Sequence, residues 1–400
     1  MTKRIWAACF ALLLIMTQTL PAMAATLGPA WSYEELQAIA ASAKDGDTIL
    51  ITGSLSAAGG QALSVGADVT IRGADANASI SGLEVIDSSI TFSSVSLTDT
   101  LAVSGRSHIE LKDGASASGA SGASGIRFSG SGALLLGAGC SVTGGEGAEG
   151  VLIRHTDGDF YGSIEGAVTG GSGSTGGPGL VVSPLRDSGA MMVTGEITGG
   201  SGSVIGGHAL NLFELSGNAH ITIDGEVTGG SGPIGGDGIQ LVSAADRVSV
   251  GVTGSVRGGE GREYGGDAML LMNAGGASVV SLSGTLSGGD ATGAGAQPGT
   301  SLMIVGDATA SHARVENCIL EDGQQLTITP APTAVPTPEA TPVPAVTPLP
   351  AITASATQIE SLPTLEPEPT PEITEATPAE AERVLPLPEP TPESEDGQTA

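Results

Sequence analysis

The segments 196–202, Glu-Ile-Thr-Gly-Gly-Ser-Gly, and 226–232, Glu-Val-Thr-Gly-Gly-Ser-Gly, differ at one position and lie 30 residues apart. Related copies run along the chain, each with an aliphatic residue, usually a hydroxyl side chain, and then a glycine pair. The pairs begin at Gly144, Gly170, Gly199, Gly229, Gly258 and Gly288. Their offsets are 26 residues for the first and 29 or 30 for the others. Near-constant spacing of this length indicates a structural repeat.

Two further apolar segments follow the glycine pair in each repeat, for example 210–212 and 221–223. A unit of two or three short strands cannot bury its apolar residues alone, whereas stacked units share a continuous interior. The pattern therefore predicts an all-β fold, a parallel β-helix with one coil per repeat. With strands about 4.8 Å apart, roughly ten coils would form a rod about 50 Å long. The alternative, an antiparallel β-sandwich with glycine-rich hairpins, fits the constant spacing less well.

Glycine and proline divide the chain into two regions. Residues 25–329 hold 62 of the 63 glycines, and residues 330–400 hold 17 of the 23 prolines. We therefore expect a β-helix over 49–329 and a disordered Pro/Thr/Glu-rich tail over 330–400. The composition of the tail is typical of an extended acidic spacer. A solvated tail that contributes only solubility is the alternative.

Residues 1–24 have the pattern of a secretory signal peptide. Lys3 and Arg4 precede an apolar core, and Ala22-Met23-Ala24 provides a small-residue cleavage site. An uncleaved anchor is disfavoured, because the apolar run of about a dozen residues is shorter than the roughly 20 that span a bilayer. The chain is expected to be exported, secreted or associated with the cell surface, without a membrane span.

Residues 25–48 are predicted to form an N-terminal cap. Ser32 and Glu35 have the spacing of a capping box, and Leu36 and Ile39 begin an apolar stripe at helical spacing. Lys44-Asp45-Gly46-Asp47 would end the helix. A helix here would cover the first coil, whose open edge could otherwise pair with other chains.

The cap and first strand carry a family resemblance. Tyr33-Glu34-Glu35-Leu36-Gln37-Ala38-Ile39 and Lys44-Asp45-Gly46-Asp47-Thr48-Ile49-Leu50-Ile51 resemble the opening of pectate-lyase-like right-handed parallel β-helix proteins. That superfamily includes non-catalytic, adhesin-like proteins of bacterial surfaces. The resemblance implies a right-handed solenoid and an extracellular role.

Enzymes of this superfamily use an acidic patch, and the lyases add an arginine or lysine base. The sequence departs from that pattern: after the leader its only lysines are Lys44 and Lys112, and we find no paired aspartates with a helper residue. Ten aromatic residues in the whole chain offer few platforms for sugar rings. We therefore expect no enzyme activity, no catalytic residues, and a structural, adhesive or envelope-associated role. The alternative is a polysaccharide lyase, a glycoside hydrolase or an inactive relic of one.

Two pairs of acids are the candidate metal ligands. Aligned repeats place Asp237 and Asp267 in one column, and Glu196 and Glu226 in another, each about 5 Å apart along the stack. Solvated surface acids are one interpretation, and a weak Ca²⁺ site is the other. No other cofactor is predicted. Thr143, Thr169, Thr198 and Thr228 also share a column. That column is either a flat hydroxyl surface or a result of the β-propensity of threonine.

Charge and cysteine positions limit the partners. A net charge of −29 argues against nucleic acid and anionic lipid, so an extracellular glycan or an envelope or matrix component is the expected partner. The oligomeric state is left open. Cys140 and Cys318 fall in one column six coils apart, about 29 Å. A disulfide needs Cα atoms within about 7 Å, so we expect two free thiols.

Overall fold

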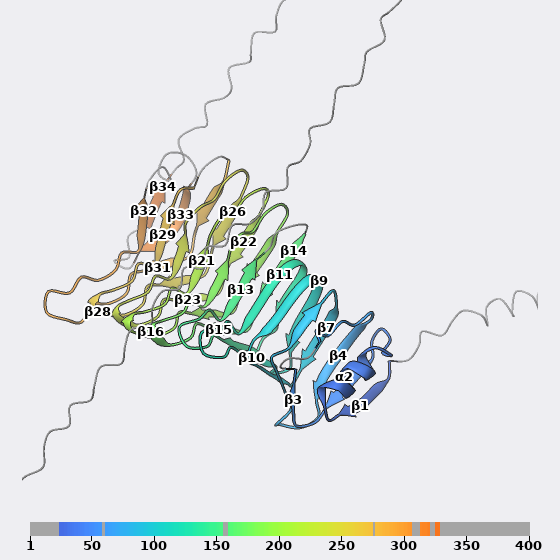
Figure 1. Ribbon diagram of the computed structural model, residues 1–400. Coiled ribbons are helices and arrows are strands. Elements are labelled where there is room, and N and C mark those ends of the chain that lie inside the picture. Colours follow the sequence, from blue (N-terminus) through green and yellow to red (C-terminus); the bar gives the residue numbers. More distant parts are fainter. Residues whose placement is uncertain are drawn as a thin grey trace, which may run out of the picture. The chain divides into compact units, whose positions relative to one another are not determined.

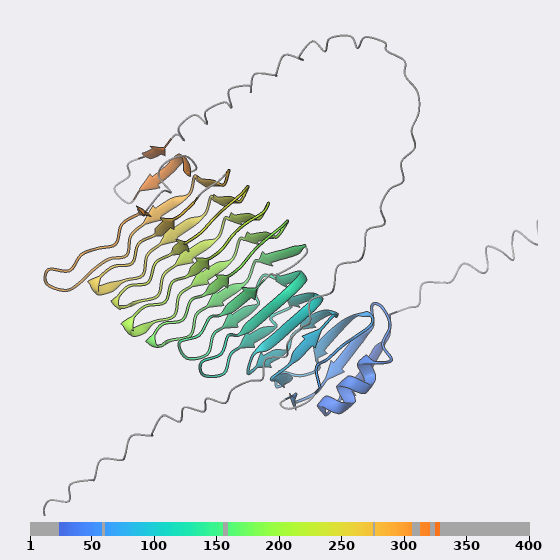
Figure 2. The ribbon, with the colours of Figure 1, turned by 45° about the horizontal axis from the view of Figure 1, so that its top comes forward.

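The computed structural model describes residues 24–57, 61–154, 159–274, 277–305, 313–320 and 325–328. They form a right-handed parallel β-solenoid of about eight turns (Figure 1). Figure 2 shows the coils stacked along one axis. The predicted signal peptide, apart from Ala24, and the predicted tail lie outside the described residues.

Each regular coil contributes one strand to each of three parallel sheets, which we call face 1, face 2 and face 3. Face 1 contains β2 (Thr48–Ile51), β4 (Asp68–Gly73), β7 (Ser89–Ser93), the second halves of β9 (Leu101–Lys112) and β11 (Ile126–Leu136), β14 (Phe160–Ile164), β18 (Ala190–Val193), β22 (His220–Ile223), β26 (Ser249–Val252) and β30 (Val279–Leu282). Face 2 contains β3 (Ser54–Ser56), β5 (Ser79–Ser81), β8 (Ser96–Thr98), β10 (Ser116–Ser118), β12 (Ser141–Thr143), β15 (Ala167–Thr169), β19 (Glu196–Thr198), β23 (Glu226–Thr228), β27 (Ser255–Arg257) and β31 (Thr285–Ser287). Face 3 contains β6 (Glu84–Ile86), the first halves of β9 and β11, β13 (Val151–Arg154), β17 (Leu180–Val182), β21 (Leu210–Leu212), β25 (Ile239–Leu241), β29 (Met269–Met272) and β32 (Leu302–Val305).

A fourth sheet projects from the side of the later coils. It consists of β16 (Gly173–Thr175), β20 (Gly202–Ile205), β24 (Gly232–Ile234) and β28 (Gly261–Tyr264), all parallel. Figure 1 shows β16 and β28 beside the stack, next to the turns that follow face 2. No strand was predicted at these positions from the sequence, so this sheet is an addition to the predicted fold.

The number of turns is slightly smaller than the roughly ten predicted. Complete three-sided coils run from β5 to β30, whereas the coils at both ends are partial. At the N-terminal end, the third side is reduced to a single bridge between Leu63 and Val85. At the C-terminal end, β33 (Ala313–Leu320) pairs with β30 and β31, and β34 (Gln325–Ile328) runs antiparallel to β33.

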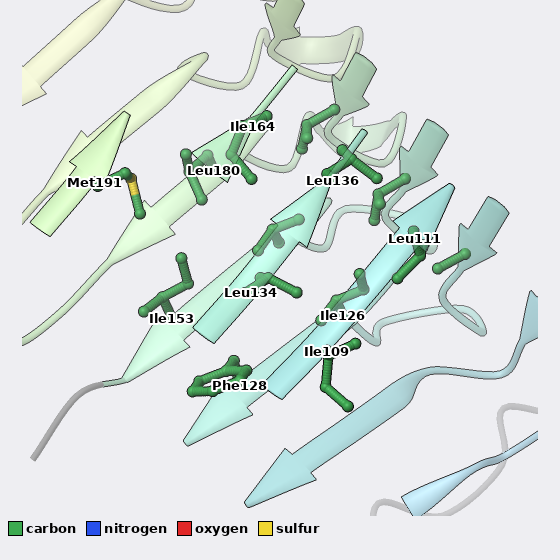
Figure 3. Close-up of a cluster of buried hydrophobic side chains, with 14 of the residues drawn as sticks. Ile109, Leu111, Ile126, Phe128, Leu134, Leu136, Ile153, Ile164, Leu180 and Met191 are labelled. Carbon is green, nitrogen blue, oxygen red and sulfur yellow. The ribbon is translucent and has the colours of Figure 1, made fainter. Parts of the chain in front are cut away.

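The core is a set of aliphatic ladders that run through the interior of the stack. On face 2, Val168, Ile197 and Val227 occupy one register column, and each is fully buried. Figure 3 shows the same stacking between faces 1 and 3, where Leu134 and Ile153 point into the interior. Phe128 and Phe160 meet edge to face with ring centroids 5.2 Å apart. Every repeat thus adds apolar side chains to one continuous interior, as the sequence pattern predicted.

The N-terminal end is covered by α2 (Tyr33–Ala40), which packs against β1 (Thr26–Ala30) and β2. The Ser32 hydroxyl accepts a hydrogen bond from the Glu35 N–H, which confirms the predicted N-cap. The Glu35 carboxylate accepts from the Trp31 N–H, so the capping box closes one residue earlier than in the usual motif. Strand β1 pairs with β2 in parallel and extends the stack by a strand that the sequence did not predict.

The cysteine columns agree with the predicted alignment. Cys140 is a buried free thiol, and burial raises its pKa. Ile319 pairs with Thr285, so Cys318 follows the register position of Gly284, in the column that the alignment assigned to it. The side chain of Cys318 lies outside the described part of the structure.

Replacing Ile197 by alanine should destabilise the stack. Ile197 is fully buried between Val168 and Val227, so Ile197→Ala should lower the free energy of unfolding by about 2–5 kcal/mol. The neighbouring Glu196 points outward, and Glu196→Ala should change this free energy by less than about 0.5 kcal/mol. Urea unfolding followed by far-UV circular dichroism measures both, and equal losses would contradict the inward and outward assignment.

Candidate functional site

Glu196 and Glu226 lie one above the other at the start of successive face 2 strands. Their register pairing confirms the predicted column, with Ala167 before them and Ser255 after them. Both carboxylates are exposed, and Glu196 accepts a hydrogen bond from the Thr198 hydroxyl. In the described ranges, no group of three or more His, Cys, Asp or Glu side chains is placed to hold a metal ion.

Asp237 and Asp267 belong to a hydrogen-bonded ladder beside face 3. Asp237 Oδ1 accepts from the backbone N–H of Asp267 at 2.9 Å, and Asp267 Oδ1 accepts from the N–H of Thr300 at 2.7 Å. The other Asp237 oxygen accepts from the Gln240 side chain. These carboxylates therefore join successive coils, and they lie on a different side of the coil from Glu196 and Glu226. The structure does not bring the four candidate ligands into one site.

His208 begins the same ladder. Its Nδ1 accepts a hydrogen bond from the N–H of Asp237 at 2.9 Å, and it lies 3.4 Å from Asp237 Oδ2. Burial lowers the pKa of His208 below its ordinary value of 6.5, although the Asp237 carboxylate acts in the opposite direction. A neutral imidazole with an unprotonated Nδ1 fits both observations.

Hydroxyl side chains cover the outer surface of face 2. Thr143, Thr169, Thr198 and Thr228 form the predicted column, and serines or threonines occupy both outward positions in the five earlier strands β3, β5, β8, β10 and β12. Some of these hydroxyls bond to one another, as Ser79 does to Ser54 at 3.0 Å. This self-pairing supports the β-propensity interpretation of the column more than a dedicated binding surface.

The projecting sheet is carried on a neck of glycine pairs. The neck consists of Gly170–Gly171 with Gly176–Gly177, Gly199–Gly200 with Gly206–Gly207, Gly229–Gly230 with Gly235–Gly236, and Gly258–Gly259 with Gly265–Gly266. Within one coil, Gly207 N–H donates to the carbonyl of Gly200, and Gly200 N–H donates to Gly177 in the coil before. Two backbone layers are thus in direct contact. A Cβ at Gly207 would lie 2.1 Å from the Gly177 oxygen, so the neck excludes side chains.

Beyond the neck, the sheet exposes a column of larger side chains. We call this sheet and its glycine neck the fin. The register pairs Thr175 with Ile205, Ile205 with Ile234, and Ile234 with Tyr264. The last three side chains are 37%, 36% and 49% exposed, and the neighbouring Val204 is also exposed. Apolar side chains usually point into a protein interior, but the neck has no interior in which to bury these.

A hollow of about 430 Å³ lies at the edge between face 2 and face 3 of the earlier coils. Its charged lining residues are Glu84, Asp99, Arg127 and Arg154. None of these four residues was predicted from the sequence to belong to a site. The alternation in β11 places Ile126 and Phe128 inside and Arg127 outside, which is a usable signal for one of them.

No family model, curated protein or solved structure matches the chain. Within the described ranges, no helix combines the length and the apolarity that crossing a bilayer requires.

Replacing Gly207 by alanine should disrupt the neck. The added Cβ would overlap the backbone oxygen of Gly177, so Gly207→Ala should lower the free energy of unfolding by at least about 1–3 kcal/mol. Gly251 is the matched control in β26, because its Cβ would meet no atom closer than 4.0 Å. Gly251→Ala should be neutral or stabilising by up to about 1 kcal/mol. The urea midpoints of both variants test whether the two backbones are in close contact. An unchanged midpoint in Gly207→Ala would refute that contact.

Acid should weaken the ladder at His208. The folded-state pKa is lower than 6.5, so the unfolded chain binds more protons as the pH falls from about 6.5 toward the folded value. The contribution of His208 to stability is therefore present above pH 6.5 and is lost across that window. Unfolding midpoints at pH 7.5 and pH 5.0 should differ less in His208→Gln than in the original chain. An identical pH dependence in both would count against this assignment.

Proposed function

We propose that the chain is an exported, non-catalytic β-solenoid with an adhesive or envelope-associated role. The observation that carries this proposal is the fin, which holds Ile205, Ile234 and Tyr264 exposed at the regular spacing of the coils. Exposed apolar groups commonly mark interaction surfaces. The predicted signal peptide supports export. The resemblance of residues 33–51 to adhesin-like β-helix proteins of bacterial surfaces supports the adhesive or envelope-associated role.

The fin suits an extended partner. Its side chains repeat about every 4.8 Å along the axis, so one partner with a short repeat could meet equivalent groups on successive coils. The strongly acidic chain disfavours polyanions in general. A neutral or weakly charged glycan, or a protein of the matrix or envelope, is the class of partner that these properties favour.

Loss of the exposed fin side chains should weaken adhesion. Residues 25–400 would be tested against immobilised glycans and matrix proteins, beside a variant with Ile205→Ser, Ile234→Ser and Tyr264→Ser. We expect at least a tenfold loss of affinity for the partners that the original chain binds, about the effect of losing 1.4 kcal/mol.

The control for this experiment changes side chains of similar exposure on face 1. Tyr161→Ser with Val279→Ser removes residues that are 45% and 44% exposed and leaves the fin intact. This control should bind as the original chain does. The proposal would be contradicted if the fin variant bound as tightly as the original chain, or if the original chain bound none of the partners.

A carbohydrate-active β-helix enzyme, or its relic, is the second candidate. The observation that favours it is the hollow beside face 3, because carboxylates and arginines are the side chains that lyases of the resembled superfamily use. Incubating residues 25–400 with a panel of polyuronates and Ca²⁺ distinguishes the two candidates. A product that absorbs ultraviolet light, the mark of an unsaturated sugar, would overturn the non-catalytic proposal.

A further inference from the structure

The hollow beside face 3 has opposite charges at its two ends. It crosses four successive coils, with Glu84 and Asp99 on the first two and Arg127 and Arg154 on the next two. Glu84 pairs in register with Ala102, and Ala102 pairs with Arg127. The Cα atoms of Glu84 and Arg127 are therefore about 10 Å apart along the axis.

The two arginines form one basic end. Arg154 pairs in register with Ser129, which lies two residues beyond Arg127 in β11. One strand step and two residues separate their Cα atoms, which gives about 8 Å. Both side chains are exposed, so both guanidinium groups can turn toward a shared ligand.

Three charged groups of the hollow are available to a ligand, although Glu84 lies near Tyr33, whose pKa is raised by burial and by this carboxylate. Glu84, Arg127 and Arg154 make no side-chain hydrogen bond or ion pair with a described residue, whereas Arg257 and Arg262 do pair with carboxylates. The other polar groups of the hollow are already held in place by hydrogen bonds. The Asp99 carboxylate accepts from Ser81, Thr100 donates to the Ser124 carbonyl, and Ser124 donates to Glu149.

We propose that this hollow binds a small zwitterion, with its carboxylate at Arg127 and Arg154 and its ammonium group at Glu84 and Asp99. Guanidinium groups match carboxylates in geometry, and 430 Å³ falls within the usual range of small-molecule sites. A free anion would meet the repulsion of a chain with net charge −29, and a free cation would meet the arginines. A dipolar ligand without net charge avoids both penalties. This site is independent of the adhesive role of the fin.

Calorimetric titration of residues 25–400 at low ionic strength tests the proposal. The probes are glycine, 4-aminobutyrate and 6-aminohexanoate, which separate the two charges by increasing distances. Acetate and butylamine carry one charge each and serve as controls. At least one zwitterion should bind about tenfold more tightly than either control, because it gains a second charged contact. No detectable binding, or equal binding of acetate, would overturn the proposal.

Substitutions at the basic end and at the acidic end of the hollow test the two charged contacts separately. Arg127→Gln with Arg154→Gln should reduce the affinity of the best zwitterion at least tenfold, and Glu84→Gln should also reduce it. Arg257→Gln is the matched control, because it removes a guanidinium that pairs with Asp290 outside this hollow. Thermal melts followed by circular dichroism show whether each variant remains folded. Unchanged affinity in the folded double variant, or an equal loss in Arg257→Gln, would refute the assignment.

Discussion

Each coil of the solenoid satisfies most of its backbone hydrogen bonds through the coils directly before and after it. The three parallel faces can therefore persist only if every coil returns to the same register. Extra residues must leave the stack sideways, between faces. The repeat lengths show this constraint directly. From Gly144 to Val151 the chain turns in seven residues without a fin strand, and from Gly170 to Leu180 it needs ten residues to include β16. The difference of three residues is the difference between the 26-residue repeat and the 29-residue repeat.

The fin also depends on stacking in register, and glycine is the residue that allows its neck to stack. Gly207 and Gly200 of one coil hydrogen bond directly, and a Cβ at either residue would overlap a backbone oxygen of the coil before. Glycine is therefore required along the neck, although it weakens strands elsewhere. Residues beyond the neck have no interior to enter, so Ile205 and Tyr264 remain partly in solvent. The glycine-rich repeats therefore build a hydrogen-bonded projection with exposed apolar side chains.

Much of the stack could be predicted from the sequence, because the repeat period assigns each residue of the regular coils to a register column. The columns of Ile197 and of Glu196 with Glu226 needed only the repeat spacing, and the structure confirms both. The fin was missed because glycine pairs are also typical of simple turns, and nothing local distinguishes two layers in contact from a loop. The hollow was missed for another reason. Successive face 2 strands of the earlier coils start 25, 17, 20 and 25 residues apart, so Glu84 and Arg127 could not be aligned by a constant period.

The acidic columns show that equal spacing does not imply equal chemistry. Asp237 Oδ1 already accepts from a backbone N–H of the next coil, so a cation bound there would compete with a bond that holds the stack together. Glu196 and Glu226 leave their carboxylates in solvent, but two side chains supply few of the six to eight oxygens that Ca²⁺ takes. The aspartates therefore favour a structural role and the glutamates a solvated one. Glu84 differs from both, because the charge nearest to it along the face 3 column is that of an arginine, two coils away.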